Sequence, residues 1–210
     1  MNGKKRNASM NDWIGGYNSV FKCLGGRGHG QEEREVNDYY ATDPMAVDYL
    51  VENNLLPDCI WECACGEGHL SRRLEEEGYD VYSSDLVDRG YGVSGVDFLK
   101  ADEKPSDKIK CIVTNPPYKY ATEFVLHAID ILKPGDKIFM FLKTTFLEGR
   151  RRKEMLFDRF PPKTIYQFSG RVACAKNGNF GKMKKIGSAV AYAWYEWEIG
   201  SYGTTTLKWI

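Results

Sequence analysis

The feature that most constrains the fold is an alternation of short apolar runs and helical segments over residues 58–198. The pattern predicts strands at 58–63, 79–84, 110–114, 137–143, 164–168 and 189–198. It predicts helices at 44–54, 68–77, 121–132 and 151–159, the first of them begun by Asp43 as N-cap and Pro44 at the first helical position. Strands separated by helices require right-handed crossovers and a mostly parallel sheet with helices on both faces.

The last two predicted strands differ from the others because only a loop separates them, so we expect one of them to be antiparallel at an edge. The sequence therefore predicts a Rossmann-like α/β fold whose mostly parallel sheet ends in an antiparallel C-terminal edge hairpin. A chain of 210 residues has the size of one such domain. Residues 1–36, rich in Gly, Asn and charged side chains, are predicted to be an N-terminal arm or lid, and residues 37–210 the domain.

Composition narrows the possible environments and partners. Lysine plus arginine and aspartate plus glutamate number 29 each, so only local charge can indicate a polyanionic partner. No apolar run reaches the length of a membrane span, and the polar N-terminus lacks a signal-peptide core, so we expect a soluble, cytoplasmic protein. The six cysteines form no CxxC pair, and we expect reduced thiols and no metal site.

The first candidate ligand site is the turn Trp61–Leu70, where a strand passes into a helix. Gly66 and Gly68 allow a ligand to approach the backbone next to the positive end of the following helix. A tight turn with no ligand would also explain two glycines, because a lone match of this kind has a high false-positive rate. The turn alone therefore leaves both interpretations open.

Acidic residues further along the chain favour the ligand interpretation. Asp85 ends the next predicted strand about 20 residues after the glycines, the spacing at which a carboxylate accepts hydrogen bonds from ribose hydroxyls. Asp97 and Phe98 follow a glycine-rich loop, where a carboxylate and a ring can bind and stack on an adenine. Asp85 can also be a solvated loop acid. Together with the glycine turn, these residues predict a cofactor that contains a nucleoside.

The second candidate site is Asn115-Pro116-Pro117-Tyr118, which follows the predicted buried strand 110–114. A residue before proline is pushed out of the α region, so Asn115 and Pro116 are held extended. The result is a stiff bracket at the carboxyl end of a strand, where open α/β sheets bind ligands. It offers the Asn115 amide oxygen and the Pro116 carbonyl as acceptors, with the Tyr118 ring beside them.

Two acceptors and a flat ring suit a planar group that bears an NH2. Such an amine is a poor nucleophile because its lone pair is delocalised into the ring. Holding both of its hydrogens would favour a more tetrahedral nitrogen aimed at an electrophile, which is catalysis by positioning and needs no strong base. A simple proline-rich turn is the alternative, and the neighbouring cofactor motifs count against it.

These motifs together resemble those of class I methyltransferases that use S-adenosylmethionine. Asn115-Pro116-Pro117-Tyr118 matches the catalytic motif of the DNA N6-adenine group. Glu62–Gly68 resembles the cofactor loop, and Tyr39–Pro44 the upstream segment that contacts the methionine end of the cofactor. Over nearly its whole length the chain is similar to the small phage and prophage DNA N-6-adenine methyltransferases.

The resemblance implies a site-specific enzyme that transfers a methyl group from S-adenosylmethionine to the N6 amine of a flipped adenine in double-stranded DNA, in a bacterial host cell. It implies catalytic roles for Asn115, Pro116, Pro117 and Tyr118. It implies cofactor-binding roles for Tyr40, Thr42, Glu62, Cys63, Gly66, Gly68, Asp85, Asp97, Phe98 and Asn115. Only about 90 residues follow Tyr118. A large target-recognition domain therefore has no room, and specificity is expected to be short, relaxed or supplied by loops and a second subunit.

Two local basic stretches favour a nucleic acid as substrate. Cations at the start of the predicted helix 151–159 oppose its dipole, which suggests a use beyond helix stability. The loop 169–188 carries cations and no acid among its glycines, as expected of a segment that grips a phosphate backbone. The predicted DNA-binding residues are Arg150, Arg151, Arg152, Lys153, Arg171, Lys176, Lys182, Lys184 and Lys185. A solvated hairpin remains the alternative for the loop.

Several other functions remain open. The Asn-Pro-Pro-Tyr motif also occurs in enzymes that methylate glutamine in release factors and in some RNA methyltransferases. A DNA-binding protein that has lost catalysis would keep the basic stretches, and an N4-cytosine enzyme would present the same kind of amine to the same acceptors. A nicotinamide dehydrogenase shares the glycine turn but leaves the Asn-Pro-Pro-Tyr bracket unexplained.

Overall fold

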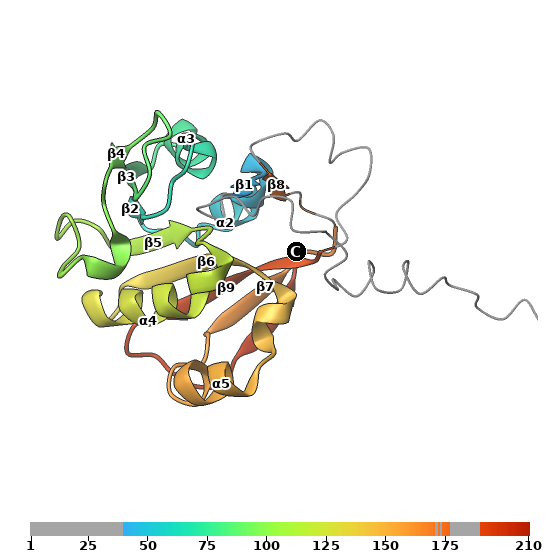
Figure 1. The fold of residues 1–210 in the computed structure, drawn as a ribbon. Helices are drawn as coiled ribbons and strands as arrows, with labels where there is room; N and C mark the ends of the chain where they lie inside the picture. The colour runs from blue at the N-terminus through green and yellow to red at the C-terminus, as the bar shows by residue number, and fades with distance from the viewer. Residues whose placement is uncertain (1–39, 171, 173, 177–189) are drawn as a thin grey trace, which may run out of the picture. The chain divides into compact units, whose positions relative to one another are not determined.

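The computed structural model describes residues 40–170, 172, 174–176 and 190–210, which belong to one compact unit, Arg34–Ile210 (Figure 1). The predicted N-terminal arm, residues 1–36, lies outside the described residues. So do Arg171, Lys182, Lys184 and Lys185 of the predicted basic loop.

The centre of the unit is an eight-stranded sheet with the order β10-β7-β9-β6-β5-β2-β3-β4. Its strands are β2 (Cys59–Glu62), β3 (Asp80–Asp85), β4 (Val93–Ser94), β5 (Cys111–Thr114), β6 (Lys137–Lys143), β7 (Thr164–Gln167), β9 (Tyr192–Glu198) and β10 (Thr206–Trp209). β9 runs antiparallel to its neighbours β6 and β7, and every other pair in this sheet is parallel.

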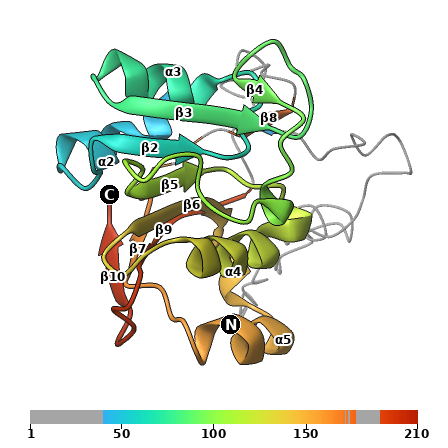
Figure 2. The same ribbon diagram turned by 90° about the vertical axis from the view of Figure 1, so that its left-hand side faces the viewer.

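Helices cover both faces of the sheet (Figures 1 and 2). On one face, α4 (Ala121–Ile131) packs Phe124, Val125 and Ala128 against the strands, beside the short α5 (Arg150–Arg152) and the π-helical turn η5 (Lys153–Phe157). On the other face lie α2 (Asp48–Glu52) and α3 (His69–Glu76), which contribute apolar side chains such as Leu50 and Leu74 to a second core cluster. Burial of these apolar stripes on two faces is what stabilises the three-layer arrangement.

Short 3-10 turns lie in the connections between these elements: η1 (Pro44–Ala46), η2 (Phe98–Lys100), η3 (Tyr118–Tyr120) and η4 (Thr144–Leu147). Asp43 caps η1, since its side chain accepts a hydrogen bond from the Met45 backbone N–H at 3.2 Å. This is the capping that the sequence predicts, although the first helix is divided into η1 and α2.

The predicted α/β fold is confirmed, with its mostly parallel sheet, the antiparallel pairing of the last two predicted strands, β7 and β9, and helices on both faces. β9 lies inside the sheet, between β6 and β7, and β10 forms the edge. β10 is not predicted from the sequence, because its four residues are all exposed and give no buried apolar signal. A second, two-stranded sheet, in which β1 (Tyr40–Thr42) pairs antiparallel with β8 (Cys174–Lys176), is also not predicted.

No helix in the part of the chain that the structure describes is long and apolar enough to cross a bilayer. Within the same ranges, no group of three or more His, Cys, Asp or Glu side chains is arranged to hold a metal ion.

Candidate active site

The candidate site lies where the connections from the central strands diverge. β2 pairs in parallel with β3 on one side and with β5 on the other, so the loops after β2 and β5 leave the same edge of the sheet and run in opposite directions. In open α/β sheets this switch point forms a crevice that binds ligands. The glycine turn follows β2, and Asn115-Pro116-Pro117-Tyr118 follows β5.

The structure brings Gly66 and Asp85 into direct contact. Gly66 has a positive φ of 58°, and its backbone N–H donates to Asp85 Oδ2 at 2.8 Å. The other carboxylate oxygen of Asp85 accepts from the Val87 N–H at 2.9 Å. The carboxylate therefore joins the loop after β2 to the end of β3, at the edge where a ribose is expected.

Gly68 is explained by packing within the protein. Its φ is +81°, and a Cβ at this position would lie 2.3 Å from the Tyr91 ring. The ring is held in turn, because the Tyr91 hydroxyl donates to Glu75 at 2.9 Å and the Arg72 guanidinium lies 4.5 Å from the ring centroid. The structural reason for this glycine is therefore contact with Tyr91. This contact is not predicted from the sequence, because an isolated Tyr among glycines gives no periodic signal.

Glu62, at the end of β2, is a buried acid next to the glycine turn. Burial raises the pKa of its carboxyl to about 8, and the nearby Asp85 and Glu75 act in the same direction. It accepts a hydrogen bond from Ser71 Oγ, which itself accepts from Ser83 Oγ at 2.8 Å. A pKa of about 8 means that the neutral acid predominates at pH 7.

The other residues predicted to bind the cofactor differ in exposure. The neighbouring Cys63 is buried, and burial raises the pKa of its thiol well above the usual range. Asp97 caps η2 by accepting from the Leu99 N–H at 3.2 Å. Phe98 is 2% exposed, and its ring lies 5.2 Å from Trp61 and 4.9 Å from Phe124. This ring serves the core, so any contact of Phe98 with a cofactor rests on its backbone.

The Asn-Pro-Pro-Tyr bracket is tied to the upstream segment. Asn115 Nδ2 donates to Thr42 Oγ1 at 2.8 Å, across 73 positions of sequence. Thr42 is 3% exposed and sits on β1, opposite Cys174 of β8. Pro116 is buried, whereas Asn115 is half-buried. Two segments that the sequence predicts separately, for cofactor and for catalysis, are therefore in direct contact. The Tyr40 backbone pairs with Lys176 on the same two strands.

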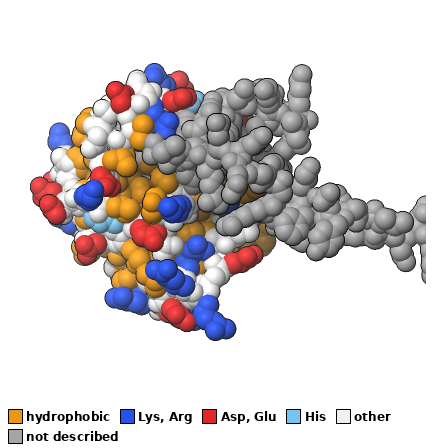
Figure 3. Space-filling view, in the orientation of Figure 1, with side chains coloured by type: hydrophobic (Ala, Val, Ile, Leu, Met, Phe, Trp, Pro, Cys, Tyr) orange, Lys and Arg blue, Asp and Glu red, His pale blue; other side chains and the backbone are white. Residues whose placement is uncertain are grey.

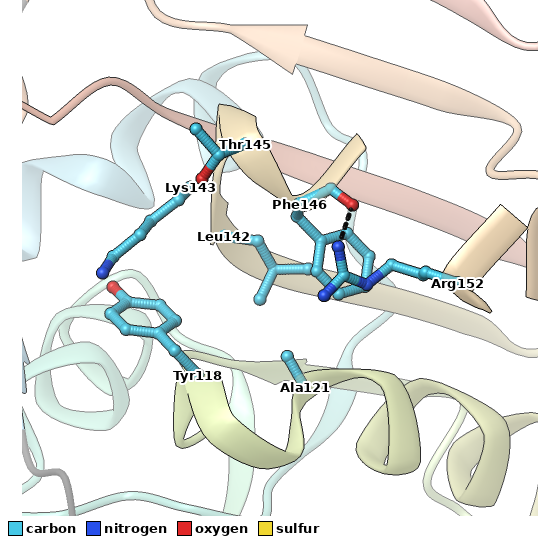
Figure 4. Close-up of a pocket in the computed structure, with 7 residues that line it drawn as sticks. All are labelled: Tyr118, Ala121, Leu142, Lys143, Thr145, Phe146 and Arg152. Atoms are coloured by element: carbon cyan, nitrogen blue, oxygen red, sulfur yellow. Dashed lines mark hydrogen bonds between the residues drawn. The ribbon is translucent and has the colours of Figure 1, made fainter. Parts of the chain in front are cut away.

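Tyr118 lies on the wall of a small pocket of about 100 Å³ (Figure 4). The Lys143 ammonium lies 4.6 Å from the centroid of its ring, and the Tyr192 ring stacks on it with centroids 6.2 Å apart. The pocket opens at the carboxyl end of β6 and the start of α4. Its lining residues are Tyr118, Ala121, Leu142, Lys143, Thr145, Phe146 and Arg152.

The predicted basic cluster at α5 divides into exposed and internally bound side chains. Arg150 and Arg151 are exposed, at the end of the unit where Figure 3 shows Lys and Arg side chains with some acids among them. Arg152 is half-buried and donates to the Phe146 and Glu148 carbonyls at 2.6 and 2.7 Å. Burial lowers the pKa of its guanidinium. Arg152 therefore holds its own turn together and is badly placed to reach a phosphate.

Lys153 and Lys176 are also among the residues predicted to bind DNA. Lys153 is exposed and pairs with Asp158 at 2.6 Å. Lys176 belongs to β8, whose backbone the structure describes.

Comparison with known proteins identifies the fold. No protein-family model and no curated protein matches the chain. Solved structures do match, among them a Listeria monocytogenes protein assigned as a class I S-adenosylmethionine-dependent methyltransferase (TM-score 0.59, 14% identity, 91% of this chain and 71% of that one). Another is the M protein of the type I restriction enzyme EcoKI (TM-score 0.56, 14% identity, 80% of this chain and 45% of that one).

A third match is the 1,6-didemethyltoxoflavin-N1-methyltransferase of Burkholderia thailandensis, solved with bound S-adenosylhomocysteine (TM-score 0.51, 11% identity, 75% of this chain and 77% of that one). At identities of 11–14% these likenesses establish shared architecture. The chain has the fold of the class I S-adenosylmethionine-dependent methyltransferases.

Proposed function

We propose that the protein is an S-adenosylmethionine-dependent methyltransferase that acts on the N6 amine of adenine in DNA. The observation that carries the proposal is the position of Asn115-Pro116-Pro117-Tyr118. This bracket follows β5 at the switch point of the sheet, beside the glycine turn after β2, and the Asn115 amide is oriented by Thr42. The fold and the glycine turn support methyl transfer from a cofactor that contains a nucleoside, and the bracket supports a planar amine as the methyl acceptor.

The residues at the switch point fit S-adenosylmethionine. Asp85 offers a carboxylate for ribose hydroxyls at the end of β3, and Asp97 offers one for an adenine amine. Gly66 keeps the loop after β2 free of a side chain, so that a ligand can approach its backbone. Thr42 lies next to the bracket, through its hydrogen bond with Asn115, and Glu62 ends β2 just before the glycine turn. When bound, the cofactor supplies an electrophilic methyl group on a sulfonium.

In the proposed reaction the protein orients the amine towards the methyl group. Tyr118 stacks on the adenine, while Asn115 Oδ1 and the Pro116 carbonyl accept the two amine hydrogens. Because Asn115 Nδ2 is bound to Thr42, the carbonyl end of the amide is the end that points to the substrate. With the amine held in this way, its nitrogen would form a bond to the methyl carbon while the bond from that carbon to the cofactor's sulfur broke, and the extra proton of the methylated amine would pass to water.

DNA is the favoured macromolecule. Arg150 and Arg151 present exposed cations on α5, whose third residue, Arg152, lines the pocket. Phosphate contacts of this kind orient a duplex without reading its sequence. Among the structural neighbours is a protein of a DNA restriction system. The resemblance to phage and prophage enzymes favours site-specific action in a bacterial cytoplasm.

Methyl transfer from labelled S-adenosylmethionine tests the proposal. Equal masses of unmethylated duplex DNA, structured RNA and a glutamine-containing release factor are incubated with the wild-type protein and with Asn115→Ala. We expect label in DNA only, and loss of that label in the variant. Label in RNA or protein would contradict the proposed substrate. No label anywhere, with cofactor still bound, would contradict the proposed activity.

A further inference from the structure

The side chains of Lys143 and Tyr118 make a contact that the proposed reaction does not use. The Lys143 ammonium lies 4.6 Å from the centroid of the Tyr118 ring, and both side chains line the pocket drawn in Figure 4. A cation at this distance over an aromatic face is attracted by the ring's quadrupole. The contact therefore restrains the ring that the proposed mechanism places against the substrate.

Lys143 reaches Tyr118 from a rigid position. It is the last residue of β6 and pairs directly with Tyr192 of β9. Its carbonyl accepts a hydrogen bond from the Tyr195 hydroxyl at 3.2 Å, and the next residue, Thr144, donates its N–H to Ala191 at 3.0 Å. The backbone that carries the lysine is thus held by contacts with β9 and the residue before it, and the ammonium moves by rotation about the side-chain torsions.

Tyr118 is supported by aromatic rings as well as by the cation. Its ring stacks on Tyr192 with an interplanar angle of 30°, and Tyr192 stacks on Phe141 with centroids 5.0 Å apart and an angle of 15°. Phe141 is fully buried in β6. Tyr118 therefore ends a row of rings that begins in the core, and Lys143 adds a second, electrostatic restraint beside that row.

We infer that Lys143 is a positioning residue of the proposed methyltransferase, which acts by holding the Tyr118 ring in the orientation that stacks on the substrate base. The inference rests on the proposed function and adds a residue to it. A ring that is already oriented loses less conformational freedom when the base enters, so base binding is tighter and the amine is placed more accurately. Lys143 does this through Tyr118 and takes no proton.

The chain offers a matched control for the lysine–tyrosine contact. Lys119 lies 5.0 Å from the centroid of Tyr120, in the turn next to the bracket. Tyr120 is 43% exposed and lies outside the pocket. Lys119→Met and Lys143→Met therefore remove the same charge and the same kind of contact from neighbouring rings, of which one belongs to the proposed site.

The first experiment measures steady-state methyl transfer to duplex DNA. We expect Lys143→Met to lower kcat/KM about tenfold, Lys143→Arg to restore most of it because guanidinium makes the same contact, and Lys119→Met to stay within about twofold of wild type. In a Tyr118→Leu background, Lys143→Met should have no further effect. An equal loss in both backgrounds would overturn the inference, because Lys143 would then contact the substrate directly. So would a Lys143→Met variant with wild-type kcat/KM.

A second experiment does not depend on activity. In protein labelled with 3-fluorotyrosine, the Tyr118 resonance is assigned by its loss in Tyr118→Phe. We expect Lys143→Met to shift this ¹⁹F resonance, Lys143→Arg to reverse the shift and Lys119→Met to leave it in place. An unchanged resonance in Lys143→Met would overturn the inference. A shifted resonance in a protein that methylates nothing would support the contact while the proposed function fails, so the two failures are distinguishable.

Discussion

Asn115 and Thr42 are joined by a hydrogen bond of 2.8 Å that runs from the amide Nδ2 to the threonine Oγ1. The bond connects the bracket after β5 to the short strand β1, which pairs with β8. It also decides which end of the Asn115 amide faces the proposed amine. Thr42 was expected to contact cofactor, and its observed contact is with the residue proposed to hold the substrate.

Replacement of Thr42 by valine tests this connection. Valine keeps the shape of the side chain and removes the acceptor, so the Asn115 amide loses its fixed orientation. We expect kcat for methyl transfer to fall about tenfold and the free energy of unfolding to fall by about 1 kcal/mol. Thr42→Ser keeps the hydroxyl and should retain most of the rate. Equal kcat values for the valine and serine variants would contradict the orienting role.

A comparison of Gly68 and Gly78 distinguishes backbone strain from a side-chain clash as the cost of adding a Cβ. Both have positive φ, +81° and +90°, but a Cβ at Gly68 meets the Tyr91 ring, whereas nothing lies within 4 Å of one at Gly78. Gly78→Ala should therefore cost about 1 kcal/mol for backbone strain alone. Gly68→Ala should cost about 1–3 kcal/mol more, measured by chemical denaturation. Tyr91→Ala combined with Gly68→Ala should recover part of that difference, and a full additive loss would contradict the packing explanation.

Arg152 and Arg151 are adjacent in sequence and are predicted to behave differently. Arg152→Met leaves the Phe146 and Glu148 carbonyls without their charged donor, so the free energy of unfolding should fall by about 2 kcal/mol. The DNA affinity of Arg152→Met should fall with salt concentration as steeply as that of the wild type. Arg151→Met should change the free energy of unfolding by less than about 0.5 kcal/mol. It should also reduce the slope of log affinity for DNA against log salt concentration by about one, because one phosphate contact is lost. The reverse pattern would show that Arg152 is the phosphate contact.

Stability should depend on pH through Glu62. Its pKa is about 8 in the folded protein because of burial, against an ordinary value of 4.5. Between these two pH values the unfolded chain has lost the proton that the folded protein keeps. The contribution of Glu62 to the free energy of unfolding is therefore complete below pH 4.5. It falls as pH rises towards 8, by up to about 1.4 kcal/mol per pH unit. Denaturation curves of wild type and Glu62→Gln should diverge over this range, and a constant difference between them would contradict the shift.

Much of the fold could be predicted because its strands are buried and its helices amphipathic. Cys111–Thr114 is buried at all four positions, and α4 places its apolar residues on one face, so both elements give strong periodic signals. The exposed edge strand β10 and the pairing of β1 with β8 give no such signal. The pairing of β1 with β8 depends on contacts between residues more than 130 positions apart, which a local pattern cannot register.

The position of the candidate site residues in the fold was predictable where a backbone constraint is visible in the sequence. The two prolines after Asn115 and the spacing from Gly66 to Asp85 are such constraints, and the structure brings each set to the same edge of the sheet. Side-chain packing was not predictable in this way. The Phe98 ring belongs to the core, Tyr91 fills the space over Gly68, and Lys143 reaches Tyr118 from another strand. Each of these contacts is decided by tertiary structure.

The most direct test of the central claim is the identity of the methylated nucleoside. Unmethylated duplex DNA is treated with the wild-type protein and S-adenosylmethionine, digested to nucleosides and analysed by mass spectrometry, with Asn115→Ala as the control. The proposed mechanism predicts N6-methyladenine with the wild-type protein and none with the variant. Methylation of a ring carbon, or N6-methyladenine at equal levels with Asn115→Ala, would contradict an amine held by the Asn115 bracket.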